Sequence, residues 1–125
     1  MLKKFLPVLF LPLLLAGCAT HVTNLTPLQQ VRNPNNLYSV DVALASNQQT
    51  LRWDSVRAQI LVGAEVYPMR GTLLMTNRWE GLVPVPPGAK SVTYRYRFDY
   101  DYNAIGKPKA GSRLSKEYTL CVQEK

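Results

Sequence analysis

The stretch that decides the fold is residues 92–102, which read VTYRYRFDYDY. From Val92 to Tyr102 every second residue is apolar or aromatic, and the residues between them are Thr, Arg or Asp. Successive side chains of a β-strand point to opposite faces, whereas the 3.6-residue period of a helix would scatter the aromatic residues around its axis. The stretch is therefore predicted to be a long strand that buries Tyr94, Tyr96 and Phe98 and exposes its charged side chains.

The same period of two recurs on both sides of this stretch. It predicts further strands at residues 38–45, 56–62, 66–69, 72–76, 79–85 and 114–122. Turns are expected at residues 47–49, at Gly63 and at Pro86-Pro87-Gly88, because proline fixes φ and glycine accepts a positive φ. Residues 103–112 contain two glycines and a proline and are expected to form a loop.

About seven short strands, with turn signals between them and no amphipathic helix, predict an all-β domain. Their spacing suits a small antiparallel two-sheet sandwich. In this respect residues 37–125 resemble an immunoglobulin-like or fibronectin type III-like domain, without the Cys–Trp–Cys framework of antibody domains. A small open β-barrel is the structural alternative. Trp79 is expected to lie in the core.

The N-terminus carries a second pattern. Lys3 and Lys4 precede an apolar run over residues 5–16, and the run closes on Leu15-Ala16-Gly17-Cys18. A membrane-spanning helix needs about 20 apolar residues, and this run is shorter. The order of a basic start, an apolar run, small residues and a cysteine resembles the signal peptide and lipobox of a bacterial lipoprotein. The resemblance implies cleavage before Cys18 and covalent lipid on Cys18; the alternative is an uncleaved N-terminal anchor.

This resemblance divides the chain into three parts. Residues 1–17 are the expected signal peptide, residues 18–36 the lipidated cysteine and a flexible tether, and residues 37–125 the β domain. The tether is expected because residues 19–36 are polar, contain two prolines and show little periodicity. Ala19 stands where an Asp would favour retention in the inner membrane, so the resemblance implies the outer membrane of the cell envelope. The membrane face is left open.

Composition narrows the function. The formal net charge is +7, with Lys3 and Lys4 inside the expected signal peptide and the other charges interspersed. An exported protein of this kind is not expected to bind nucleic acid. The chain has two cysteines. If Cys18 carries lipid, Cys121 has no intramolecular partner, and it is expected to be partly buried in a strand, with a disulfide between chains as the alternative.

Residues that commonly carry catalysis or bind metal are scarce. The single histidine, His21, lies in the expected tether, so no Ser/His/Asp, Cys/His or zinc site is expected. Asp99 and Asp101 share a strand face with Arg95 and Arg97, and this pattern indicates a solvated charged face rather than a catalytic pair. Residues 99–103 resemble the start of a calcium loop, but Ala104 and Ala110 replace the expected Gly and Glu. The chain is expected to be no enzyme and to hold no metal or cofactor beyond the lipid.

Two function classes follow. The first is a docking module that binds a larger envelope protein, either through an exposed face containing Arg95, Arg97, Asp99 and Asp101 or through an edge strand at residues 38–45 or 114–122. The second is a carbohydrate-binding lipoprotein that uses Trp53, Tyr100 and Tyr102 as a platform for a sugar ring or polysaccharide. The segment from Trp79 to Tyr100 resembles the strand pairs of starch-binding-type modules. The first class is the prediction.

The lipobox interpretation is testable with Cys18→Ser. Removal of the thiol removes the site of lipid attachment, so the variant is expected to accumulate as an unprocessed or soluble form. Membrane fractionation and the mass of the N-terminal peptide measure both effects. Accumulation of a lipidated species of mature size would show that the interpretation is wrong.

Overall fold

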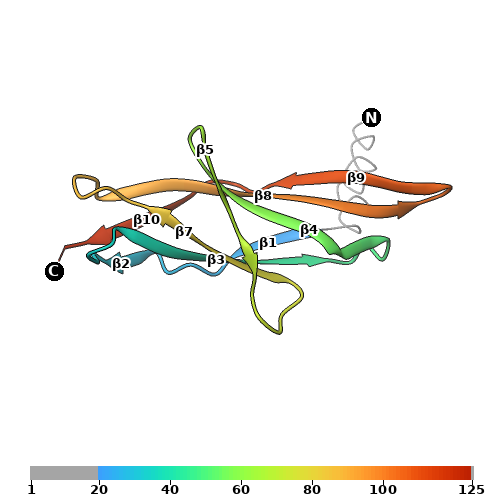
Figure 1. The fold of residues 1–125 in the computed structure, drawn as a ribbon, viewed down its shortest axis with the longest axis horizontal. Coiled ribbons are helices and arrows are strands. Elements are labelled where there is room, and N and C mark those ends of the chain that lie inside the picture. Colours follow the sequence, from blue (N-terminus) through green and yellow to red (C-terminus); the bar gives the residue numbers. More distant parts are fainter. Residues whose placement is uncertain (1–19, 125) are drawn as a thin grey trace, which may run out of the picture.

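The computed structural model describes residues 20–124, which form ten β-strands and no helix. The strands lie in two stacked sheets along one elongated axis and form no closed barrel, as Figure 1 shows. The expected all-β class and two-sheet arrangement are confirmed. The strands are β1 (Thr20–Asn24), β2 (Gln29–Val31), β3 (Leu37–Ser46), β4 (Leu51–Val62), β5 (Glu65–Pro68), β6 (Arg70–Gly71), β7 (Arg78–Pro84), β8 (Ser91–Ala104), β9 (Lys107–Leu114) and β10 (Tyr118–Gln123).

The first sheet has the strand order β1-β3-β7-β6, and all its pairs are antiparallel. The second has the order β2-β10-β8-β4-β5, and β2 runs parallel to β10. β9 also pairs with β8, over the half of β8 that β10 does not reach. β8 thus has partners along both edges, and its alternating pattern sets the inner and outer faces of the second sheet.

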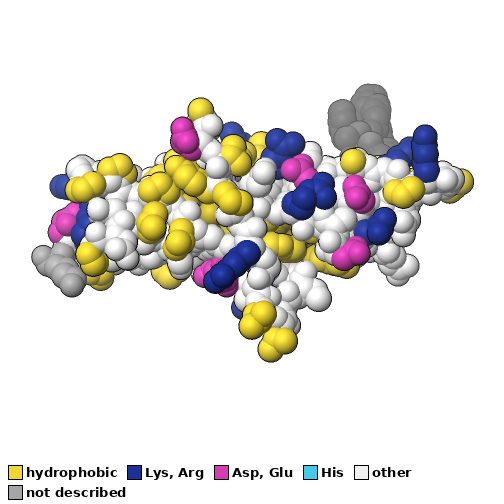
Figure 2. Space-filling view, in the orientation of Figure 1, with side chains coloured by type: hydrophobic (Ala, Val, Ile, Leu, Met, Phe, Trp, Pro, Cys, Tyr) yellow, Lys and Arg dark blue, Asp and Glu magenta, His cyan; other side chains and the backbone are white. Residues whose placement is uncertain are grey.

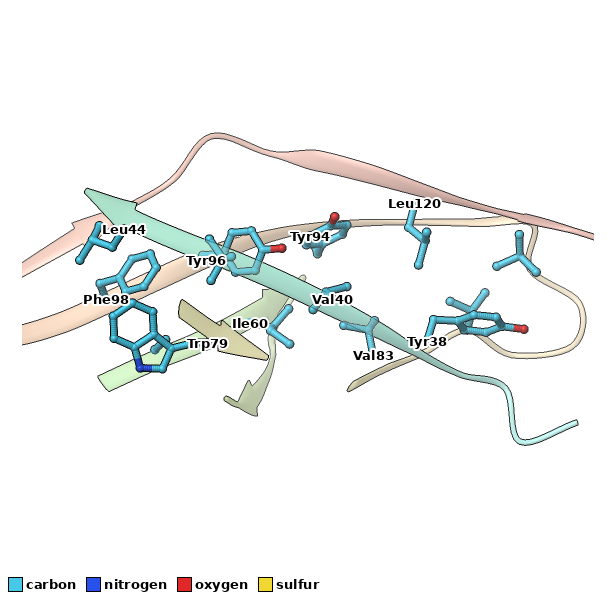
Figure 3. Close-up of a cluster of buried hydrophobic side chains, with 14 residues drawn as sticks. Tyr38, Val40, Leu44, Ile60, Trp79, Val83, Tyr94, Tyr96, Phe98 and Leu120 are labelled. Atoms are coloured by element: carbon cyan, nitrogen blue, oxygen red, sulfur yellow. The ribbon is translucent and has the colours of Figure 1, made fainter. Parts of the chain in front are cut away.

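The core lies between the sheets. Tyr94, Tyr96 and Phe98 of β8 are at most 2% exposed, and they face residues from the first sheet, as Figure 3 shows. The Trp79 ring meets the Phe98 ring edge to face, with 5.5 Å between the ring centroids. The predicted inward set of the sequence is therefore confirmed, including Trp79, which is 6% exposed.

Buried tyrosine hydroxyls connect the two sheets. The Tyr96 hydroxyl donates a 2.6 Å hydrogen bond to Asn24 Oδ1, and Asn24 Nδ2 donates a 2.9 Å hydrogen bond to the Tyr94 hydroxyl. The Thr26 hydroxyl lies 3.2 Å from the same Tyr96 oxygen. Burial raises the pKa of Tyr96 well above its ordinary value, so the hydroxyl stays protonated as a donor.

The expected flexible tether at residues 18–36 contains two strands, β1 and β2. β1 pairs with β3 in the first sheet, and β2 pairs with β10 in the second. The segment therefore passes from the edge of one sheet to the edge of the other. The physical reason is that Asn24 and Thr26 satisfy hydroxyls in the core, which a solvated tether could not do. Residues 1–17 and Cys18 lie outside the described residues.

Arg32, which follows β2, links separate segments of the chain near Glu124, the last described residue. Its guanidinium donates hydrogen bonds of 2.6–3.3 Å to the backbone oxygens of Val85, Pro86, Pro87 and Ala89. It also forms a 2.9 Å ion pair with Glu124, and this contact lowers the pKa of the Glu124 carboxyl. The planar guanidinium of Arg32 thus connects the end of β2 with the expected turn at residues 86–88 and with Glu124.

Three further expectations are corrected. Residues 72–76 form a turn rather than a strand. The expected loop at residues 103–112 is mostly strand: Gly106, with φ of +94°, makes a tight turn, and β9 returns along β8. Pro108 fits there because β9 pairs only with β8 among the described strands. The expected last strand is interrupted at residues 115–117, where Ser115 Oγ accepts a hydrogen bond from the Tyr96 backbone.

Neither strand proposed as a free edge is one. β3 lies between β1 and β7, and β10 lies between β2 and β8. β1 and β2, which the sequence pattern did not predict, pair along the edges that were expected to be free. The expectation that residues 38–45 and 114–122 form free edge strands is therefore corrected: β1 pairs with residues 42–46 and β2 with residues 121–123.

Trp79→Ala tests the core. The substitution removes the edge-to-face contact with Phe98 and leaves a cavity, so we expect a loss of about 3–5 kcal/mol of unfolding free energy, measured by urea denaturation. Leu82→Ala, on the opposite face of the same strand and 51% exposed, is the control and should change stability by about 0.5 kcal/mol or less. Equal effects of the two variants would contradict this core assignment.

Candidate functional site

A hollow lies on the outer face of the first sheet, beside the segment in which β5 and β6 cross between the sheets. It is a groove of about 770 Å³. Its lining residues are Ser39, Asp41, Tyr67, Pro68, Met69, Arg70, Glu80, Gly81 and Leu82. On the face in Figure 2, hydrophobic side chains gather around and to the left of this crossing.

Sheet register brings the polar residues of the groove together. Asp41 of β3 stands directly opposite Glu80 of β7, and Arg70 of β6 stands opposite Glu80 on the other side. A Cβ on Gly81 would lie 2.9 Å from the Ile60 side chain and 3.2 Å from the Pro68 carbonyl oxygen. The absence of a side chain at Gly81 therefore lets the crossing segment approach β7 and form the groove wall.

The two acids of the groove differ in their partners. Glu80 receives hydrogen bonds from Arg70, at 2.8 and 3.0 Å, and from the Thr72 hydroxyl, at 3.3 Å. No described side chain donates a hydrogen bond to the Asp41 carboxylate. Burial raises the pKa of Asp41, the neighbouring Glu80 raises it further, and Arg78 opposes the shift. Asp41 is therefore the acid of the groove whose charge is least compensated.

This arrangement favours recognition of a side chain that combines apolar and cationic parts. Tyr67, Met69 and Leu82 offer apolar contact, and Asp41 offers a carboxylate with unused acceptor capacity. A Lys or Arg on an apolar segment meets both requirements, because its methylene stem packs on apolar surface while its charge pairs with the acid.

The charged face predicted from the sequence lies on the other sheet. Arg95, Arg97, Asp99 and Asp101 share the outer face of β8, opposite to the buried tyrosines. Arg97 Nε donates a 3.2 Å hydrogen bond to Asp99 Oδ1, and Arg57 and Arg52 of β4 stand opposite Asp99 and Asp101. Asp99 and Asp101 thus each lie opposite an arginine of β4, whereas Arg97 and Arg95 lie opposite Gln59 and Leu61.

The three aromatic residues proposed as a sugar platform are each half-buried. Trp53 and Tyr100 pack against the core. The Tyr100 ring also covers Gly111, where a Cβ would lie 2.9 Å from the ring. Among residues 20–124, no close ring pair includes Trp53, Tyr100 or Tyr102. A sugar platform needs exposed rings, and none of these three side chains is in the exposed class.

The remaining singled-out residues are isolated. His21 is exposed on β1, and Cys121 is a half-buried free thiol on β10. Residues 20–124 contain no group of three or more His, Cys, Asp or Glu side chains that could hold a metal ion. Within the same range, no helix is long and apolar enough to cross a membrane.

Comparison of the chain with protein-family models, with curated proteins and with solved structures finds no match. Function is therefore inferred from the geometry of the chain itself.

The groove was missed in the sequence, although part of its signal was visible. Leu82 occupies an outward position of a strand whose inward residues are Trp79 and Val83, so it is an apolar residue placed toward solvent. Asp41 is an outward acid on β3 and looks like any solvated charge. Its position beside Glu80 depends on the pairing of β3 with β7, which a single-strand pattern does not specify.

Asp41→Asn tests the electrostatics of the groove. A carboxyl with a raised pKa in the folded state destabilises the fold when ionised, and this penalty is lost as the pH falls through the raised pKa. We expect Asp41→Asn to raise Tm at pH 7 by about 2–4 °C, with the gain shrinking on acidification. Asp54→Asn, at an exposed acid, is the control. A gain that grows on acidification would contradict the assignment.

Proposed function

We propose that this chain is a lipid-anchored, non-enzymatic docking module of the bacterial cell envelope. In this proposal Cys18 holds the chain in the outer membrane, and the groove beside β5 and β6 binds a segment of a larger envelope protein. The observation that carries the proposal is Asp41, a partly desolvated acid without a donor, set among Tyr67, Met69 and Leu82.

Strand order supports an immunoglobulin-like assignment of the sandwich within this proposal. In immunoglobulin domains one sheet has the order A-B-E-D and the other contains G-F-C, extended by C′ in variable-type domains. The order β1-β3-β7-β6 corresponds to the first, and β10-β8-β4-β5 corresponds to the second.

The partner segment is expected to be basic and apolar. The ionised form of the Asp41 carboxylate lowers the stability of the fold, and a cation that pairs with it would offset this penalty. The chain as a whole has a formal net charge of +7, so an acidic groove is an exception on its surface. An apolar residue next to a Lys or Arg would bury against Leu82 and pair with Asp41.

A photo-crosslinking amino acid at Leu82, used in cells, tests the proposal. We expect one discrete adduct with an envelope protein, mapped to a segment that contains Lys or Arg. Asp41→Lys in the same protein should abolish most of the adduct, because it replaces the attraction by repulsion.

The matched control places the crosslinker at Thr119, an exposed position on β10 of the other sheet. The docking proposal fails if Leu82 gives no adduct, if Thr119 gives the same one, or if Asp41→Lys leaves it unchanged.

A further inference from the structure

Two turns present aliphatic side chains fully to solvent. Leu73 and Leu74, in the turn between β6 and β7, are 86% and 97% exposed, and Ile105, at the tip of the β8–β9 hairpin, is completely exposed. Figure 2 shows hydrophobic side chains at both tips. Such residues contribute nothing to the core, and their side chains are available for contact with a molecule outside the chain.

Backbone hydrogen bonds define the conformation of the turn that contains Leu73 and Leu74, called the leucine turn below. The Thr72 backbone N–H donates to the Arg78 carbonyl at 2.9 Å, and the Met75 N–H donates to the Thr72 carbonyl at 3.0 Å. Leu74 has φ of +66°, in the left-handed region that branched side chains avoid. Strained backbone that is held in place at an exposed position is characteristic of functional contacts.

The β8–β9 hairpin extends beyond the first sheet, and β4 accompanies β8 as far as Tyr102, which pairs with Leu51. Arg113 of β9 pairs with Phe98 of β8, and its side chain donates a 2.8 Å hydrogen bond to the carbonyl of Thr20, the first residue of β1. Phe98 therefore lies close to the beginning of β1. From Phe98 the strand β8 continues for six more residues to Ala104, about 20 Å at the rise of an extended strand. Figure 1 shows the hairpin projecting past the first sheet along the long axis.

Both turns lie toward the end of the first sheet at which the described chain begins. Thr20 pairs with Ser46, and the Asn77 carbonyl accepts a hydrogen bond from the backbone of Leu44, two residues away along β3. Cys18 is two residues before Thr20, so an extended chain places it at most about 7 Å away. A lipid on Cys18 would therefore bring a bilayer to this end of the molecule.

The charges next to the tips suit a lipid surface. Arg78 directly follows the leucine turn, and Lys107 and Lys109 follow Ile105; all three are exposed. Residues 71–77 and 104–110 contain no acid. Apolar side chains beside Lys or Arg bind the interface of anionic membranes, since the apolar part enters the headgroup layer while the cations meet the phosphates.

We propose that the Leu73–Leu74 turn and the Ile105 hairpin tip enter the interface of the bilayer that holds the Cys18 lipid. The inference rests on the proposed lipid anchor. The turn projects across the long axis and the hairpin along it, as Figure 1 shows, so both reach one plane only when the domain lies tilted on the membrane. The anchor and the two tips then fix the orientation of the groove.

The test is fluorescence quenching in the full protein, isolated from membranes and reconstituted into phosphatidylethanolamine–phosphatidylglycerol vesicles. In a Cys121→Ser background, a polarity-sensitive dye is attached to Leu74→Cys, to Ile105→Cys or, as control, to Thr119→Cys. We expect a blue shift of emission and loss of most of the fluorescence with spin-labelled lipid at positions 74 and 105, and neither at position 119.

Quenching at positions 74 and 105 no greater than at 119, in protein whose N-terminal peptide carries acyl groups, would overturn this inference alone. A discrete protein adduct from a crosslinker at Leu74, with no lipid quenching there, would also overturn it. An N-terminal peptide without acyl groups would instead contradict the anchor. Because the membrane-contact inference rests on that anchor, this result would overturn both.

Discussion

The structure depends on the satisfaction of the hydroxyls that the inner face of β8 carries into the core. Tyr94 and Tyr96 are nearly fully buried, and a buried hydroxyl without a partner costs about 1–3 kcal/mol. Asn24 serves both, as acceptor for one and donor for the other. This requirement draws the chain before β3 into the sandwich, so that β1 closes the first sheet and β2 closes the second.

That dependence explains which parts of the fold could be predicted from the sequence. β3, β7 and β8 were visible because each carries its own alternation of buried and exposed residues over seven or more positions. β1, β2 and β9 were missed because they are polar or rich in Gly and Pro, and they are strands only through distant partners. Asn24 bonds 70 residues along the chain, and Arg32 bonds 92 residues along it.

The candidate site was harder to predict than the fold for the same physical reason. The alternation of β8 correctly placed Arg95, Arg97, Asp99 and Asp101 on one face, but the compensation of these charges comes partly from β4. The groove requires the pairing of β3 with β7, the crossing of β5–β6 and a missing side chain at Gly81. Each is a relation between strands, and no single stretch of sequence encodes it.

Most of this chain obeys the local rules of a stable sandwich, and the exceptions are informative. Asp41 keeps a partly desolvated charge beside Glu80, and Leu74 adopts a left-handed backbone to hold an apolar side chain in water. Neither feature helps the core, and each opposes folding. Sequences that fold well violate such rules mainly where function requires it. The two exceptions lie in the groove and in the turn after β6, the two places on the first sheet for which contacts with other molecules are proposed above.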